Sequence, residues 1–347
     1  MLKTALAVTI AATISAVVMA EGKSDIKYTV PLNPEAWEIV GGKGLQSLEY
    51  MKRNALSFDK EGFHMALLKN YELENGIIEM DIAASSSGKW SFPGIVFRAD
   101  DGGKNYECIY FRPDQSGKNT AVQYSPAYNG DVSWTMYNAP DYEGVAILPR
   151  AEWFHATFVI SGTTAEIYIN NSDEPVYTVK YLERGYGKGS IGLWTFGKGY
   201  FANIEVTKTA SSTARTPFEP PAREYLSTWW LSEAIRHKHG ASIESETAEA
   251  LTSDKKGWRR IESDHKGLVN MFRFFERKNT VFAVTSISSE KIQEKEMLFD
   301  HSGRLAVYLN SEQVYSGEHK WGDADLGRMF DGRRLVKLSL KKGQNEL

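Results

Sequence analysis

The chain has 347 residues, which is long for a single β-sandwich and enough for two domains that each bury a core. Its formal net charge of -3 at pH 7 leaves no basic excess to neutralise phosphates, which argues against nucleic acid as a partner. Aromatic residues make up 12% of the sequence, a supply that serves the core of a β-protein and also suits stacking against sugar rings.

The sequence begins with the pattern of an export signal. An apolar run from Ala5 to Val18 follows Lys3 and is short for a bilayer span. Val18-Met19-Ala20 places small residues where a signal peptidase cleaves. We therefore expect residues 1–20 to be a signal peptide and the protein to be periplasmic or secreted, with an uncleaved membrane anchor as the alternative. No membrane contact beyond this segment is expected.

Cys108 is the single cysteine, so an internal disulfide is excluded. It stands in an alternating strand pattern, which favours a packed thiol over a catalytic one.

Residues 26–208 show short strands separated by turns rich in Gly, Asn and Asp. In Gly76–Ile82, the side chains of Ile78, Met80 and Ile82 face one way, while Glu79 and Asp81 face the other. Further strands are expected at 95–98, 106–112, 121–124, 153–161, 165–170, 191–194 and 200–206. Many short strands without an amphipathic helix predict an all-β sandwich or jelly roll.

The segment 209–222 is rich in small polar residues and ends in prolines, which is typical of a linker. In residues 223–347, strands are expected at 226–232, at 267–277 paired with 280–286, at 305–310 paired with 313–315, and at 336–340, with a short helix at 247–253. Because the chain then stops where another strand should start, we expect this domain to lack its C-terminal end, or to receive a strand from elsewhere.

Several phrases resemble a known family. The order of four segments is that of bacterial concanavalin-A-like lectin/glucanase (laminin-G-like) domains: Gly94-Ile95-Val96-Phe97-Arg98, Asn105-Tyr106-Glu107, Val122-Gln123-Tyr124 and Gly189–Trp194. Among these domains, the chain is most similar to the 3-keto-disaccharide hydrolase group. This resemblance implies a jelly roll over residues 26–208 whose concave face often receives glycan. Leu305–Asn310 and Leu340–Asn345 resemble galactose-binding-like accessory sandwiches, which implies a second, smaller β-sandwich at 223–347.

Glu79 and Asp81 are the expected catalytic carboxylates. Two residues apart on a strand, they project from one face and can approach the spacing of about 5–5.5 Å that retaining glycosidases use. Family-16 glucanases of this fold carry a Glu-x-Asp-x-Glu strand, but Ala83 occupies the last position here, so the proton donor of that motif is missing. The alternative is that both residues are solvated on a polar strand face.

A second group is expected to bind substrate. If their strands are adjacent, Arg98, Tyr110, Arg112 and Gln123 gather around Glu79 on one concave sheet, where Arg and Gln bind sugar hydroxyls and carboxylates. Cross-strand ion pairing is the alternative. In a following loop, Trp134 and Tyr137 form either a sugar platform or a hydrophobic plug.

No cofactor and no specific metal site are expected. Oxygen ligands from Asp100, Asp101 and Asn105 could hold Ca²⁺, although a plain turn explains them as well. The pair His237 and His239 lacks a third ligand at a suitable spacing.

Three functions stay open. The first is an exported carbohydrate-binding protein that uses the concave face of the jelly roll. The second is a glycoside-cleaving enzyme, either a hydrolase or a 3-keto-glycoside lyase, in which Glu79 removes a proton and Arg98 or Arg112 holds the oxyanion. The third is a non-catalytic structural or protein-interaction sandwich.

Overall fold

The computed structural model describes residues 26–58, 60–85, 90–138, 140–209, 225–235, 257–275 and 280–347. The expected signal peptide, the linker from residue 210 onward, the short helix at 247–253 and the pair His237 and His239 lie outside these residues. Within the described part of the chain, no helix has the length and apolar character needed to cross a bilayer.

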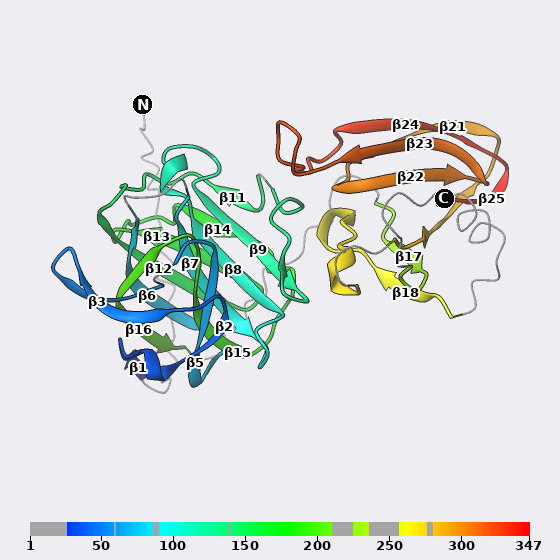
Figure 1. The fold of residues 1–347 in the computed structure, drawn as a ribbon. Helices are drawn as coiled ribbons and strands as arrows, with labels where there is room; N and C mark the ends of the chain where they lie inside the picture. The colour runs from blue at the N-terminus through cyan, green and yellow to red at the C-terminus, as the bar shows by residue number, and fades with distance from the viewer. Residues whose placement is uncertain are drawn as a thin grey trace, which may run out of the picture.

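The first part is a jelly-roll sandwich of two eight-stranded antiparallel sheets (Figure 1). One sheet, here the β6 sheet, contains β14 (Tyr177–Val179), β13 (Thr164–Ile169), β12 (Trp153–Ser161), β6 (Gly76–Ala84), β16 (Gly199–Lys208), β4 (Arg53–Phe58) and β3 (Leu45–Tyr50) in that spatial order, with β1 (Ile26–Thr29) paired to β16. The other, the β8 sheet, contains β10 (Asp131–Val132), β9 (Val122–Tyr128), β8 (Tyr106–Phe111), β7 (Phe92–Ala99), β15 (Gly189–Phe196), β5 (Phe63–Leu73) and β2 (Trp37–Gly41), with β11 (Glu143–Gly144) paired to β9.

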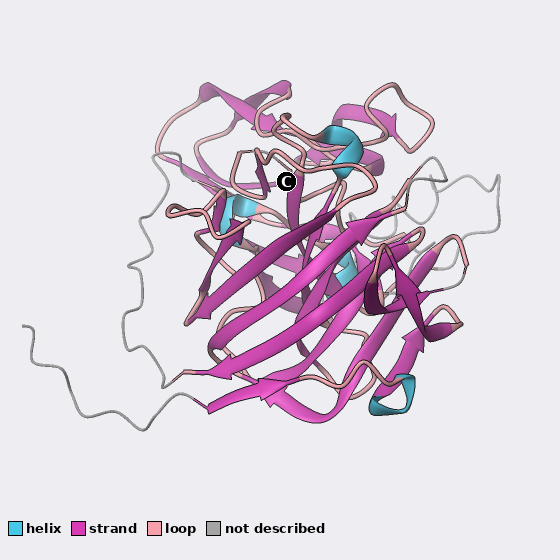
Figure 2. Cartoon of the chain, turned by 90° about the vertical axis from the view of Figure 1, so that its left-hand side faces the viewer, coloured by secondary structure: helices cyan, strands magenta, loops and turns pink. Residues whose placement is uncertain are grey.

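The core lies between the two sheets. Alternation along each strand points one set of side chains inward, as with Ile78, Met80 and Ile82 on β6. Rings from the two sheets meet there, and Phe111 of β8 packs edge-on to Phe154 of β12 at 5.2 Å. The expected all-β jelly roll is therefore confirmed. Among the residues that the structure describes, helix is confined to short 3₁₀ pieces, of which η1 (Pro34–Ala36) and η2 (Pro113–Gln115) belong to this part (Figure 2).

The described residues of the second part form several small sheets. A three-stranded sheet has the order β18 (Arg259–Glu262), β17 (Thr228–Leu231), β19 (Ala283–Val284). Three strand pairs join β20 (Ser286–Ser289) to β25 (Gly343–Glu346), β21 (Gln293–Phe299) to β24 (Arg334–Leu340), and β22 (Gly303–Leu309) to β23 (Glu312–His319). The buried leucines Leu309, Leu338, Leu340 and Leu347 form their core.

Two expectations for this part are wrong. The segment expected as a strand at 267–277 begins at the end of the 3₁₀ turn η3 (His265–Gly267), and its described residues, 267–275, hold a second one, η4 (Met271–Arg273). The Asn270 side chain accepts a hydrogen bond from the Phe272 amide at 3.0 Å, which starts η4 and prevents an extended chain. The strand at 336–340 is also not the last, because β25 follows it and pairs with β20. The sequence of β25 is polar and lacks alternation, so no pattern predicts this strand.

The second part is bonded directly to the sandwich through residues 320–333, here called the clasp loop. The Met329 amide donates to the Thr135 carbonyl at 2.7 Å, and the Met329 carbonyl accepts from Asn138 Nδ2 at 2.9 Å. Arg328 Nε also donates to Asn138 Oδ1 at 2.7 Å. These bonds fix the clasp loop against the loop that follows β10 in the sandwich.

Candidate functional site

An aromatic face lies on the outer side of the β8 sheet. Strand pairing sets Phe63 of β5 opposite Phe196 of β15, and Phe196 opposite Phe92 of β7. One row further along, Trp194 lies opposite Gly94, and Gly94 lies opposite Tyr110. Because residues two apart on a strand share a face, these rings all point away from the core. We define the aromatic face as Phe63, Trp90, Phe92, Tyr110, Trp134, Trp194 and Phe196.

Gly94 allows the inner rings of this face to pack together. The rings of Tyr110 and Trp194 lie 4.8 Å apart, on the two strands that flank Gly94. A Cβ at position 94 would lie 2.6 Å from Tyr110 Cβ, closer than real contacts allow. The missing side chain therefore lets two large rings close over the strand.

The outer rings remain accessible. Phe63, Trp90 and Phe196 are 37%, 40% and 36% exposed, whereas Trp194 and Tyr110 are buried beneath them. The ring of Phe196 lies 6.0 Å from that of Trp90 and 6.2 Å from that of Phe92. The sandwich thus presents a continuous and partly exposed set of aromatic rings.

Arg112 closes one end of the aromatic face. Its guanidinium lies 5.7 Å from the ring centre of Phe92, 5.2 Å from Tyr110 and 5.9 Å from Trp134. It donates to the Tyr110 hydroxyl at 3.0 Å and also to Gln123 Oε1. Tyr110, Arg112, Gln123 and Trp134, all expected as binding residues, are therefore brought together. Burial raises the pKa of Tyr110 to about 12, although Arg112 opposes the shift, so the hydroxyl is a neutral donor at pH 7.

Tyr137 belongs to the same loop but offers no face to a ligand. Its ring is completely buried, and its hydroxyl donates to Asp264 of the second part at 2.6 Å. Asn270 donates to the same hydroxyl at 3.1 Å. Burial, and then the Asp264 charge, raise the pKa of Tyr137 well above its ordinary value. Of the two alternatives, a sugar platform or a hydrophobic plug, the buried plug describes Tyr137. Its hydroxyl also links the sandwich to the second part.

Glu79 and Asp81 lie on the opposite outer face of the sandwich. They belong to β6, whose neighbours are β12 and β16, whereas Tyr110, Arg112 and Gln123 belong to the β8 sheet. The whole core separates the two groups, so the expected gathering around Glu79 on one sheet does not occur. Strand order in a jelly roll does not follow chain order, and the expectation assumed that neighbouring segments of sequence pair.

A polar cluster surrounds Asp81. Its carboxylate accepts from Arg53, from Asn203 Nδ2 at 2.6 Å and from His155 Nδ1 at 3.0 Å. His155 Nε2 points toward Glu79, whose Oε1 lies 3.9 Å away. Because a carboxylate only accepts, His155 carries its proton on Nδ1 in this bond. Sequence reasoning missed His155 and Arg53, although strand alternation places His155 directly opposite Asp81 once β12 and β6 are known to pair.

Arg98 belongs to neither group. Its guanidinium donates to the carbonyls of Gly185 at 2.7 Å, Glu74 at 2.9 Å and Gly162 at 2.6 Å. Burial lowers its pKa, partly offset by the Glu107 charge. These bonds tie three loops together. Arg98 therefore does not lie beside Glu79, where it was expected to hold an oxyanion.

The loop expected as a possible Ca²⁺ site is a turn held by its own hydrogen bonds to Asp100. Asp100 accepts from the Lys104 amide at 2.8 Å and from Asn105 Nδ2 at 2.6 Å. Burial favours the neutral acid, but the bonds from Asn105 and Lys104 outweigh it and lower the pKa of Asp100. Its oxygens therefore serve the turn itself.

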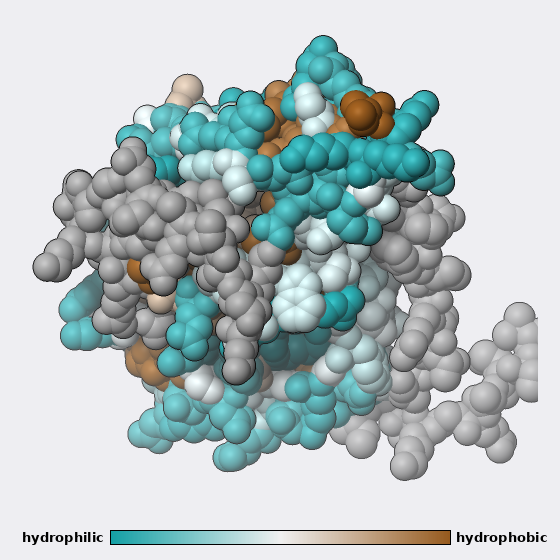
Figure 3. All heavy atoms as spheres, turned by 90° about the vertical axis from the view of Figure 1, so that its right-hand side faces the viewer, coloured by the Kyte–Doolittle hydropathy of each residue, from teal (hydrophilic) through white to brown (hydrophobic). Residues whose placement is uncertain are grey.

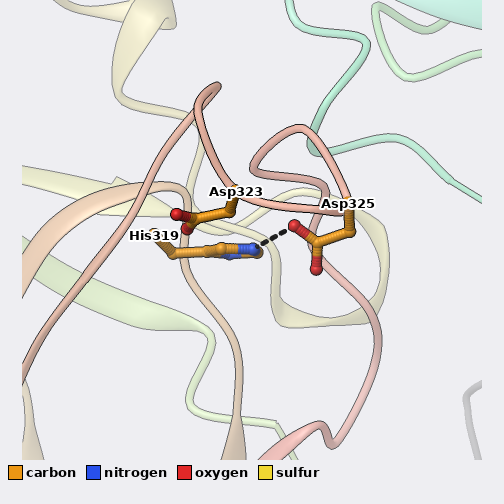
Figure 4. Close-up of side chains that lie close together, drawn as sticks. All are labelled: His319, Asp323 and Asp325. Carbon is orange, nitrogen blue, oxygen red and sulfur yellow. Dashed lines mark hydrogen bonds and ion pairs between the residues drawn. The ribbon is translucent and has the colours of Figure 1, made fainter.

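His319, Asp323 and Asp325 form a compact group in the second part (Figure 4), with ligand atoms within 4.8 Å of one another. His319 Nδ1 lies 2.8 Å from the His301 carbonyl, and Nε2 lies 2.8 Å from Asp325 Oδ1. Asp325 also pairs with Arg333, and hydrogen bonds from His319 and Arg333 lower its pKa. Because Asp325 forms an ion pair with Arg333, we interpret this group as one that fixes the ends of the clasp loop.

No family model and no curated protein matches this chain. Among solved structures, about half of the chain is similar to the carbohydrate binding module CBM66 from Bacillus subtilis, at 17% identity over 49% of this chain and 94% of that one, with a TM-score of 0.39. It is also similar to a Bacillus subtilis protein of unknown function with a galectin-like fold (14% identity, 53% and 96% covered, TM-score 0.40). A β-glucanase from Bacillus licheniformis matches at 10% identity, with 54% and 100% covered and a TM-score of 0.37. Identities and TM-scores this low do not assign an activity.

Proposed function

We propose that the protein is an exported carbohydrate-binding protein that holds a glycan on the aromatic face. The observation that carries the proposal is the continuous set of partly exposed rings from Trp90 through Phe196 to Phe92. Flat rings with an apolar face suit the C–H faces of sugars, and the buried Arg112 holds the rings of Phe92 and Trp134 at one end of the row. Export rests on the signal peptide expected at residues 1–20.

The shape of the surface favours a polymer over a compact apolar ligand. A cavity of about 330 Å³ lies elsewhere, between Tyr181 of the sandwich and Phe274 of the second part, and most of its lining side chains are charged. On the side of the second part, the described surface is mainly hydrophilic with separate hydrophobic patches (Figure 3). The aromatic face is instead an open row of rings, which an extended chain of sugars can follow.

The test is binding of the mature protein to a panel of soluble polysaccharides. The variants Phe196→Ala and Trp90→Ala should each weaken binding about tenfold or more, since each removes an exposed ring. Trp230→Ala is the matched control, because Trp230 is 42% exposed but lies on β17 in the second part. Unchanged binding in both ring variants would contradict the aromatic face as the binding site, whereas no binding by the unmodified protein would favour a structural or protein-interaction role.

The cluster around Asp81 favours a second candidate, a glycoside-cleaving enzyme. A histidine oriented by a carboxylate through Nδ1, with Nε2 directed toward another carboxylate, is an arrangement that serves proton transfer. His155 is half-buried. On the same sheet the rings of Tyr50 and Tyr200 stack with centres 3.6 Å apart, and Tyr50 lies 5.9 Å from the ring of Trp153, two residues before His155. This candidate includes the 3-keto-glycoside chemistry that the sequence resemblance implies.

The two candidates separate in a single experiment. If the protein cleaves glycosides, His155→Gln and Glu79→Gln should abolish product release from polysaccharides and 3-keto-glycosides while binding persists. Phe196→Ala tests the other face, because it should reduce binding and leave the polar cluster intact. Absence of any product from the unmodified protein would remove the enzyme candidate for the substrates used.

A further inference from the structure

The aromatic face continues beyond the sandwich. Trp134, at its end beside Arg112, packs edge-on against Trp321 of the clasp loop, with ring centres 5.6 Å apart and planes 85° apart. Trp321 is 58% exposed, more than any ring of the aromatic face. The second part therefore adds a large accessible ring to the row that the sandwich begins.

A shared carboxylate ties the clasp loop to the same group of side chains. Glu143 accepts from Arg112 at 3.3 Å and also from Arg328, and its side chain is 1% exposed. Arg112 in turn lies over the rings of Phe92 and Trp134. The clasp loop thus helps to hold the arginine that joins the two halves of the ring row.

Hydrogen bonds and ion pairs also hold the two ends of the clasp loop, so the segment that carries Trp321 is fixed in place. His319 bonds to Asp325 (Figure 4), and Arg333, at the other end of the loop, pairs with the same carboxylate. The Phe330 amide donates to Asp300 Oδ2 at 2.8 Å, and the Lys320 amide donates to Asp323 Oδ2 at 2.9 Å. These bonds preform the position of Trp321 before any ligand arrives.

We infer that the ligand is an extended glycan chain that crosses from the aromatic face onto Trp321, so that both parts of the protein build one binding site. This inference rests on the proposed function. From Trp90 to Trp321, every step along the row through Phe196, Phe92, Arg112 and Trp134 measures between 5.6 and 6.2 Å. Four of these steps lie between Phe196 and Trp321, so a ligand that contacts both rings is a chain of sugars and not a single unit.

The experiment uses the full chain and soluble laminarin, xylan, xyloglucan and polygalacturonate as probes. For the polysaccharide that binds, Trp321→Ala should weaken binding about tenfold or more, and Trp321→Phe should retain most of the affinity because it keeps a ring. Trp230→Ala again serves as the exposed-tryptophan control. Thermal unfolding checks that each variant remains folded. We expect this result because Trp321 is exposed, so its replacement leaves the core intact.

Oligosaccharides of increasing length supply a second measurement. Affinity should rise with chain length in the unmodified protein, and Trp321→Ala should remove the gain given by the longest chains while leaving disaccharide binding unchanged. Polysaccharide binding that is lost in Phe196→Ala but unaffected in Trp321→Ala would overturn this inference and leave the proposed function standing. Failure of the unmodified protein to bind any of the probes would contradict both.

Discussion

Arg328 and Glu143 form an ion pair between the second part and the sandwich, although 185 positions separate them in the chain. Glu143 is almost completely buried, and Arg112 binds the same oxygen from within the sandwich. One carboxylate is therefore shared by two guanidinium groups at the junction. This makes Glu143 a point where stability of the junction and geometry of the aromatic face depend on the same atom.

Replacing Glu143 should destabilise the protein strongly. Glu143→Gln leaves two partly buried arginines without a counter-charge, and breaking a buried pair costs about 3–5 kcal/mol. We expect a value near the lower end, since the amide oxygen still accepts a hydrogen bond. Denaturant unfolding measures it, with Glu72→Gln as control because Glu72 pairs with Lys188 on the surface. Equal effects in the two variants would show that Glu143 is not a key residue of the junction.

Adding one methyl group at Gly94 should disturb the aromatic face from within. The new Cβ of Gly94→Ala would press on Tyr110 and on the Ile109 carbonyl. Such overpacking costs about 1–3 kcal/mol and should also weaken glycan binding as the rings above shift. Gly187→Ala is the control, since no atom lies within 4 Å of its Cβ position. Thermal unfolding and glycan binding are measured on both variants, and Gly94→Ala should lose more stability and more affinity than Gly187→Ala.

The hydroxyl of Tyr137 should contribute measurably to docking of the second part. Tyr137→Phe removes its bonds to Asp264 and Asn270 and leaves a largely buried carboxylate with one partner fewer. The expected loss is about 1–3 kcal/mol of unfolding free energy. Tyr168→Phe, which loses only a bond to Glu166 within one strand, should change little. A loss of stability as large in Tyr168→Phe would argue against this role.

Alkaline pH should unfold the protein through its buried tyrosines. Burial raises the pKa of Tyr110 to about 12 and shifts those of Tyr106, Tyr124, Tyr142 and Tyr177 upward as well. A raised folded pKa means that this stability is complete below the unfolded value of about 10 and is lost as pH rises above it. Phenolate absorbance should therefore rise in two stages, and the second should coincide with loss of the circular dichroism signal. A single stage in the folded state would contradict this.

Local sequence predicts the strands of the sandwich well where alternation is strict. Trp153–Ser161 alternates between buried and half-buried positions, and the expected bounds are those of β12. Gln293–Phe299 has no such pattern, because both of its faces are partly exposed, and β21 was not predicted. The turns at Met271–Arg273 arise from the Asn270 cap, which competes with an extended conformation that the apolar residues alone suggest.

The candidate site was predictable only between strands that are consecutive in the chain. Tyr110 and Gln123 lie on β8 and β9, which are neighbours both in sequence and in the sheet, so their parity placed them together. Asp81 meets His155 and Asn203 through β12 and β16, far along the chain, and nothing local encodes that pairing. Trp321 was not predicted for the same reason, since its contact with Trp134 depends on how the second part packs against the sandwich.

Cys108 lies on the strand beneath the aromatic face, completely buried, and burial raises the pKa of its thiol. As the sequence contains one cysteine, a thiol reagent can label this chain at a single position. The thiol shares its side of β8 with Tyr106 and Tyr110, so labelling requires these packed rings to move, and its rate reports opening of the aromatic face without an engineered probe. A docked second part that restrains this motion would slow the modification of a thiol that it does not touch.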